Sequence, residues 1–297
     1  MGKVNRIGFP CLTTGLGLTT GHTLKLATFS EEKVFSKINE NITDFVKILN
    51  WMGKNNLRLF RLSCEFIPFA SHKLMTNIDW ESHVSNKLNQ IGSYFVKYDF
   101  RFSIHAMPFV VLNSQKPWVV KNSINELIYY NKLLDLMKLD STHKIIIHPG
   151  GVYNDKQQAT KDLIKTLNES IPDNVKSRLV LENDDKHYSF SDVLNIGKIC
   201  GIPPIFDIHH FYLLPSKKII KDLDESTKLW GCVPKIHASS SMPNARHGTH
   251  DDFTKKLMLK RIVKLIPFDC DIMFECGKKE EAAKQAYQYF EENNYLV

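Results

Sequence analysis

Short apolar runs alternate along this chain with longer segments in which apolar residues recur every three or four positions. The segment 31–56 shows this helical period most clearly, with Val34, Ile38, Ile42 and Phe45 on one face. The pattern predicts eight strands, at 5–9, 57–62, 100–105, 144–148, 179–182, 204–207, 233–237 and 271–275. It predicts helices at 31–56, 79–98, 119–138, 155–170, 191–200, 217–229, 252–265 and 280–292.

Strands that alternate with helices indicate parallel strands joined by helical crossovers. Eight such strands within 297 residues favour a closed (β/α)₈ barrel of the TIM type, formed by one domain over 1–297. The alternative is an open doubly wound sheet, which normally carries a glycine fingerprint directly after its first strand. Gly15 and Gly17 lie too far beyond the first predicted strand to serve as that fingerprint, and no helix begins there. We therefore expect an α/β protein with a single TIM barrel.

Composition narrows the class of protein. Hydrophobic residues make up 43% and charged residues 24%, which is ordinary for a soluble globular protein. We expect no membrane association, because no apolar run is long enough to cross a bilayer and the first residues lack the layout of a secretory signal. The six cysteines form no C-x-x-C pair and fit a reducing cytoplasm. The formal charge of +7 suits either a polyanionic partner or a lysine-rich solvated surface.

Residues that bind metals close six consecutive predicted strands. These residues are His105, His148, Glu182, Asp207, His237 and Glu275, and His210 follows Asp207 by three positions. A single histidine at a strand end more often packs or contacts solvent, but the series repeats the same chemistry at the same topological place. In a barrel the carboxyl ends of the strands meet on one face, and a carboxylate that ends a buried strand needs a partner. The sequence therefore predicts a metal site at that face.

The number of available ligands indicates several ions. One structural zinc needs four ligands, whereas at least seven are present here. Imidazole and carboxylate without thiolate suit Zn²⁺, Mn²⁺ or Fe²⁺, and ions held close together suit phosphoryl hydrolysis. His72 follows the second strand and His250 follows His237 by thirteen positions. Each would add a histidine to this site, although each alone is more typical of a surface loop or a helix start.

Four segments together identify a protein family far more specifically than any single motif does. They are 67–72, 181–184, 207–210 and 234–237. Through them and the stretch 7–11, the chain resembles the UV damage endonuclease family over almost its whole length, up to Glu275. That family belongs with endonuclease IV and the sugar isomerases among metal-dependent TIM barrels. The resemblance implies a nuclease that cuts the DNA backbone immediately 5′ of a lesion and leaves a 3′-hydroxyl.

The resemblance also implies a cofactor, partners and residue roles. Its metal ligands fall on His105, His148, Glu182, Asp207, His210, His237, His250 and Glu275. Glu182, as a bridging carboxylate, is expected to act in catalysis with Lys235 and His72; Lys235 matches a lysine that looks carboxylated in the family, while an ordinary phosphate contact is the plainer alternative. We expect two or three divalent ions, with Mn²⁺ ahead of Zn²⁺ or Mg²⁺. The expected partner is damaged double-stranded DNA, bound by a monomer at the nucleoid or in a nucleus.

The segment after the third strand departs from the family. The family usually has Pro-Gly-Gln-Tyr there, and its Gln-Tyr pair wedges into the duplex, whereas this chain has Ala106, Met107, Pro108 and Phe109. Pro108 has no side-chain donor and Phe109 lacks a hydroxyl. We expect intact hydrolysis with altered damage selection, with Met107 and Phe109 as apolar wedges; simple packing of the loop is the alternative. Phe9 and Thr13 stand where the family often has Tyr and Asn, and are expected to face the lesion too.

Three other functions remain open at this point. An abasic-site endonuclease of the endonuclease IV type shares the fold, the metals and the bond that is cut. A metal-dependent sugar isomerase would need fewer histidine ligands and a pocket for a small polyol. A damage-binding protein with a relic metal site would bind DNA without metal, which the complete ligand set disfavours.

Overall fold

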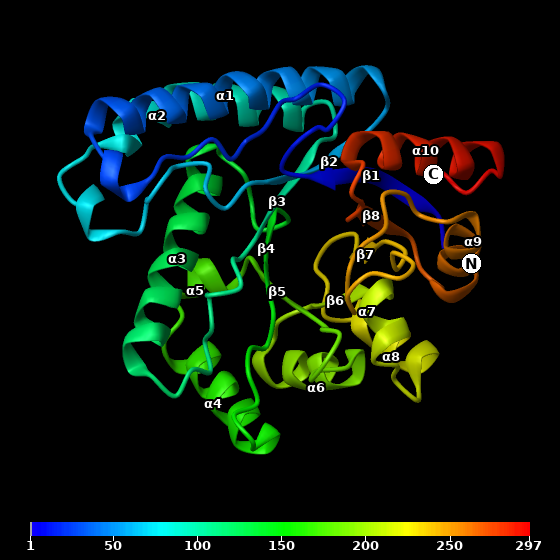
Figure 1. Ribbon diagram of the computed structural model, residues 1–297. Helices are drawn as coiled ribbons and strands as arrows, with labels where there is room; N and C mark the ends of the chain where they lie inside the picture. The colour runs from blue at the N-terminus through cyan, green and yellow to red at the C-terminus, as the bar shows by residue number, and fades with distance from the viewer. Residues whose placement is uncertain (1) are drawn as a thin grey trace.

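Eight parallel strands form a closed barrel in the computed structural model, which describes residues 2–297 (Figure 1). The strands follow one another around the barrel in chain order, and β8 pairs with β1 to close it. They are β1 (Val4–Pro10), β2 (Leu59–Leu62), β3 (Arg101–His105), β4 (Lys144–Ile147), β5 (Leu179–Glu182), β6 (Pro204–Asp207), β7 (Lys235–Ala238) and β8 (Cys270–Phe274). The predicted TIM barrel is confirmed, and the open sheet is excluded.

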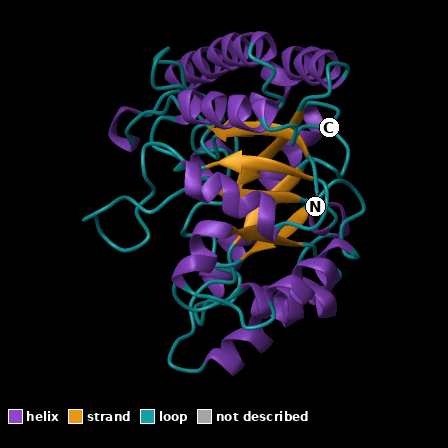
Figure 2. Cartoon of the chain, turned by 90° about the vertical axis from the view of Figure 1, so that its right-hand side faces the viewer, coloured by secondary structure: helices purple, strands orange, loops and turns teal. Residues whose placement is uncertain are grey.

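Helices surround the barrel, and loops extend beyond the strand ends (Figure 2). The helices are α1 (Glu31–Lys54), α2 (Trp80–Val96), α3 (Pro117–Leu136), α4 (Lys156–Glu169), α5 (Asp173–Lys176), α6 (Phe190–Cys200), α7 (Ile208–Leu213), α8 (Ile219–Thr227), α9 (Lys256–Leu265) and α10 (Lys279–Glu292). Ser30 and Ser189 begin α1 and α6 by accepting a backbone N–H of the first turn. No described helix is long and apolar enough to cross a membrane.

The sequence prediction missed some details of these elements. The short helices α5 and α7 were not expected. The segment predicted as a helix from 252 begins only at Lys256, because the carbonyl groups of Asp251 and Asp252 accept the N–H groups of Gly277 and Lys278. β4 ends at Ile147 and β8 at Phe274, so His148 and Glu275 lie one residue beyond their strands.

Alternation along each strand separates an apolar outer layer from a largely polar barrel interior. The main core fills the space between the strands and the helices, and a small second core of Ile146, Val180 and Ile205 lies apart from it. At the amino end of the barrel, the fully buried Asp271 accepts hydrogen bonds from Arg6 and Arg101. The amino end of the barrel is therefore filled by ion pairs, and the predicted ligands lie at the opposite, carboxyl end of the strands.

Candidate metal centre

The carboxyl ends of the strands bring the predicted ligands together. Asp207 pairs in register with His237 on the neighbouring strand, and Glu182 closes β5 beside them. Glu182, Asp207 and His237 are all fully buried, because alternation along three adjacent strands points their side chains into the barrel. His105 closes β3 on the other side of Glu182.

Glu182 lies at the centre of the cluster and contacts three imidazoles. One carboxylate oxygen, Oε2, lies 2.8 Å from His105 Nε2 and 3.6 Å from His148 Nε2. The other, Oε1, lies 2.6 Å from His237 Nδ1. The two oxygens of this buried carboxylate therefore face different histidines.

Two groups of donor atoms fit divalent ions. The donors of His105, His148 and Glu182 lie within 4.8 Å of one another, and so do those of Glu182, Asp207 and His237. Asp207 Oδ2 and His148 Nδ1 are buried and lack any hydrogen-bond partner among the described residues. An unpartnered buried carboxylate oxygen is costly, and a cation would satisfy it. The donor set of imidazole and carboxylate suits Mn²⁺ or Zn²⁺.

Asn183 orients the pair of Asp207 and His210, a role that the sequence did not reveal. Its side chain exchanges two hydrogen bonds with the backbone of Asp207, at 2.8 and 3.1 Å. Its carbonyl oxygen lies 2.9 Å from His210 Nδ1. A proton on Nδ1 donated to that carbonyl leaves His210 Nε2 as a lone-pair donor, which is the usual second partner of a metal-binding histidine.

The charges of the cluster favour a bound cation. Burial raises the pKa of Asp207 to about 7, and the carboxylates of Glu182 and Glu275 add to the effect by repulsion. Burial alone would lower the pKa of His210, but the nearby Asp207 and Glu182 outweigh it and raise that pKa to about 9. In the metal-free protein a protonated His210 thus offsets part of the negative charge of these carboxylates, and bound metal ions would take over that role.

Arg61 is the permanent positive charge in this space, and the sequence analysis did not identify it. Its Nη2 donates to Glu275 Oε1 and lies 2.9 Å from His237 Nε2. His237 Nδ1 in turn lies 3.2 Å from Glu275 Oε1. The signal was present, because Arg61 is the only charged residue of the apolar strand β2 and occupies an inward position near its end.

Lys235 lies in the barrel interior, 2% exposed, below this cluster. Burial, reinforced by Arg61 and Arg101, lowers the pKa of Lys235 well below its usual value. This environment therefore favours the neutral form of the amine. Its position fits the predicted role beside the metal ions.

His250 reaches the cluster from the loop after β7. Ser239 Oγ lies 2.7 Å from its Nδ1, and its ring lies 6.3 Å from the ring of His210. The predicted ligand is thus close to the cluster, with Nε2 not engaged by Ser239.

His72 lies apart from the eight predicted ligands, and its predicted catalytic role stays a prediction. It is half-buried, and its Nδ1 accepts the N–H of Leu74 at the start of a short 3-10 turn. It lines a cavity of about 580 Å³ together with Met107, Phe109 and Tyr130, and none of the eight predicted ligands lines that cavity. His72 therefore lies on the side of the segment 106–109.

The side chains expected to face a lesion fall into two groups. Phe109 is 58% exposed, Pro108 is exposed and Met107 is half-buried, so this turn is open to a partner. Phe9 is fully buried and packs edge-on against Phe60 under α1, and it offers no surface to DNA. The prediction for Phe9 is wrong because its side chain points outward from the barrel into the helix layer.

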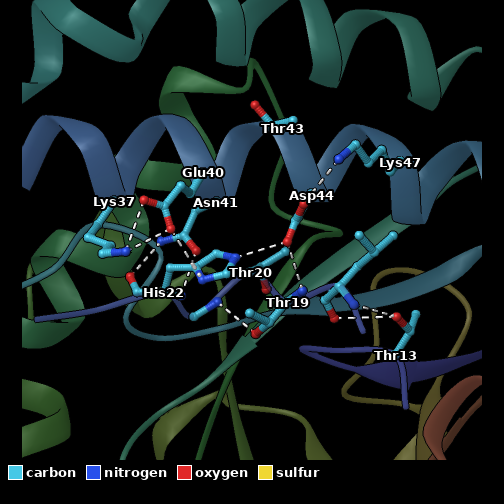
Figure 3. Close-up of polar contacts among 12 residues, drawn as sticks. Thr13, Thr19, Thr20, His22, Lys37, Glu40, Asn41, Thr43, Asp44 and Lys47 are labelled. Carbon is cyan, nitrogen blue, oxygen red and sulfur yellow. Dashed lines mark hydrogen bonds and ion pairs between the residues drawn. The ribbon is translucent and has the colours of Figure 1, made fainter. Parts of the chain in front are cut away.

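Thr13 is also unsuited to its predicted contact. It is 3% exposed, and its hydroxyl accepts the N–H of Leu18 within the loop that follows β1. Figure 3 shows how this loop is held on α1, where His22 Nε2 lies 2.9 Å from Asp44 Oδ2. Thr13 therefore stabilises the fold of this loop from within.

Comparison with known proteins decides the family. The family model described as UV-endonuclease UvdE matches residues 5–294. The chain belongs to the UV-endonuclease UvdE family. It is 32% identical to a UV DNA damage endonuclease of Clostridium perfringens, over 97% of this chain and 71% of that protein. The crystal structure of SacUVDE superposes with a TM-score of 0.93 at 34% identity, over 98% of this chain and all of that one.

The relation to endonuclease IV extends to the fold. Endonuclease IV from Thermus thermophilus matches with a TM-score of 0.57 at 14% identity, over 83% of this chain and 92% of that one. Membership of the UvdE family confirms the resemblance drawn from the sequence and the prediction of an endonuclease. The roles of individual residues stay predictions.

Proposed function

We propose that this UvdE-family chain hydrolyses the phosphodiester bond immediately 5′ of a damaged nucleotide in double-stranded DNA. The observation that carries the proposal is Glu182, which contacts three histidines and belongs to both groups of potential ligands. Two or three divalent ions would be held by the eight predicted ligands. Mn²⁺ fits imidazole and carboxylate donors, while Mg²⁺ is disfavoured by the number of histidines and Zn²⁺ stays an alternative.

The protein's own groups would prepare the site for such ions. When bound, the ions supply an activated water and neutralise charge on the phosphate and the leaving oxygen. Glu182 would bridge two ions, and His210 would present Nε2 because Asn183 accepts at Nδ1. Arg61 would hold Glu275 in place. These groups are fixed on strand ends, so little reorganisation accompanies catalysis.

Lys235 and His72 would have separate roles. The lowered pKa of Lys235 favours the neutral amine, which is the form able to react with carbon dioxide to give a carboxylated lysine. Such a group would add an anionic oxygen ligand below the cluster. His72, on the side of the segment 106–109, would contact a DNA phosphate instead of an ion.

Damage selection would depend on the turn at Met107, Pro108 and Phe109. The exposed ring of Phe109 would enter the stack of a weakened base step, where a lesion lowers the cost of unstacking. The net charge of +7 would bring the duplex to the site through its phosphates. We propose that the chain acts as a monomer with one domain over 1–297, at the nucleoid or in a nucleus.

The altered turn also favours an abasic-site endonuclease as a second candidate. Pro108 offers no hydrogen bond to a damaged base, and an apolar wedge can fill the gap that a missing base leaves. This function would use the same metal centre and cut the same bond.

A nicking assay separates the two candidates. Duplexes carrying a cyclobutane dimer, a 6-4 photoproduct, an abasic site, a deaminated base or no lesion are incubated with Mn²⁺ or with a chelator. Metal-dependent cuts 5′ of the photoproducts support the proposal, and Phe109→Ala should weaken them more than Phe253→Ala, a matched change of an exposed ring in another loop. Cuts confined to abasic or deaminated sites would favour another repair role. No cut in any damaged duplex would contradict both candidates.

A further inference from the structure

The loop that carries His250, residues 239–251, is a narrow hairpin with two antiparallel arms. Ser241 and His250 form an isolated antiparallel bridge between its arms. Further backbone hydrogen bonds run from Met242 N to Thr249 O at 3.0 Å and from Asp251 N to Ser240 O at 2.7 Å. The tip of the hairpin, 243–247, is exposed. A potential metal ligand thus sits at the base of an element whose far end has little packing of its own.

His209 contacts both arms of this hairpin from α7. It is 1% exposed, and its Nδ1 lies 3.3 Å from Ser241 Oγ on the outgoing arm. Its Nε2 lies 3.4 Å from the carbonyl oxygen of Gly248 on the returning arm. A carbonyl oxygen only accepts, so Nε2 carries the proton and Nδ1 accepts from the Ser241 hydroxyl. Both ring nitrogens are therefore used by the hairpin.

The ring of His209 also packs on the ligand itself. The centroids of the His209 and His250 rings lie 4.9 Å apart. With Ser239 Oγ at Nδ1 of His250 and His209 against its face, the ring of His250 is held in one orientation. Asp207 caps α7, and His210 follows His209 on the same helix. Through His209, this helix therefore connects Asp207 and His210 with His250.

We propose that His209 is a positioning residue that fixes His250 for metal binding by clamping both arms of the hairpin 239–251. The proposal rests on the proposed role of His250 as a metal ligand. His209 does not bind an ion itself, because its two nitrogens are engaged by Ser241 and Gly248. Its effect is to hold a donor in place that the exposed hairpin would otherwise leave mobile.

The test is metal binding by the whole chain, without DNA and without turnover. Mn²⁺ is titrated into metal-free protein, and bound ions are followed by electron paramagnetic resonance. His209→Phe keeps the ring against His250 and removes both hydrogen bonds. We expect it to weaken binding of the ion that His250 holds by about 10- to 100-fold, the range for loss of an outer partner of a metal ligand. His209→Gln, which can restore the hydrogen bond to Gly248, should recover part of the affinity.

His247→Asn is the matched control, because His247 belongs to the same hairpin but is exposed at its tip. It should bind Mn²⁺ as the wild type does. His250→Ala separates this inference from the proposed function. Normal affinity in His209→Phe with reduced affinity in His250→Ala would overturn the clamp alone. Normal affinity in both would overturn the ligand role of His250 as well.

A second variant decides the question if His209→Phe does not fold, as judged by circular dichroism. Ser241→Ala removes one hydrogen bond of the clamp at an exposed position. We expect a loss of Mn²⁺ affinity of about two- to tenfold, as for one hydrogen bond. Unchanged affinity in this folded variant would overturn the clamp.

Discussion

Replacing Arg61 by methionine removes a buried cation from the middle of the carboxylate cluster. Arg61 is 6% exposed and contacts both Glu275 and His237. Without it, the partly buried charge of Glu275 has no permanent partner. Loss of one partner of a buried ion pair costs about 3–5 kcal/mol.

This cost corresponds to a measurable change in melting temperature. An unfolding entropy of about 2.1 cal/mol/K per residue gives about 0.6 kcal/mol/K for 297 residues. Metal-free Arg61→Met should therefore melt roughly 5–8 °C below the wild type. Bound Mn²⁺ can replace the lost positive charge, so the difference should become smaller when the ion is saturating.

The assay is thermal unfolding of wild type and variant, each with chelator and with Mn²⁺. Arg101→Met is the matched control, because Arg101 is equally buried but pairs with Asp271 at the opposite end of the barrel. It should lose similar stability, with no recovery on adding Mn²⁺. Arg61→Lys keeps the charge and should lose less in the metal-free state.

Either of two results would refute this reasoning. If metal-free Arg61→Met melts at the same temperature as the wild type, the pairing of Glu275 with Arg61 does not stabilise the fold. A loss that Mn²⁺ leaves unchanged, as in Arg101→Met, would mean that the ion does not bind beside Glu275.

Two further predictions concern other parts of the chain. Burial lowers the pKa of His143 to about 3, and its Nδ1 accepts the N–H of Phe102. Because this folded-state pKa lies below the unfolded value of about 6.5, the stability it provides is present above pH 6.5 and lost as the pH falls towards 3, by about 2 kcal/mol at pH 5. Chemical denaturation at pH 7 and 5 should show this loss in wild type and a smaller one in His143→Gln; equal losses would contradict it. Arg246 is exposed at the tip of the hairpin 239–251, and Arg246→Ala should reduce the salt slope of duplex binding by about 1, whereas an unchanged slope would exclude a phosphate contact.

The fold and the centre of the site could be predicted because both depend on local pattern. Apolar runs that end in His, Glu or Asp identify strands and place their last residues at one face. Glu182, His105 and His237 meet there as expected. Boundaries were less accurate: α9 begins late because the segment before it is hydrogen-bonded to residues 277–278, and β4 ends one residue before His148.

The partners of these ligands could not be predicted in the same way. Asn183 and Ser239 act through contacts set by the path of loops, which no periodicity records. Phe9 was misassigned by its match to a family position, although it shares the outward side of β1 with Ile7. The position of His72 beside the segment 106–109 likewise depends on the path of its loop, which the sequence pattern does not record.

The most direct test of the metal centre compares wild type with Glu182→Gln in the same samples. Bound Mn²⁺ per protein and the rate of incision of a duplex with a single 6-4 photoproduct are measured together. The account predicts that the variant loses bound metal and cuts at least on the order of 100-fold more slowly, because Glu182 belongs to both ligand groups. A Glu182→Gln protein that binds metal normally and cuts as fast as the wild type would contradict it.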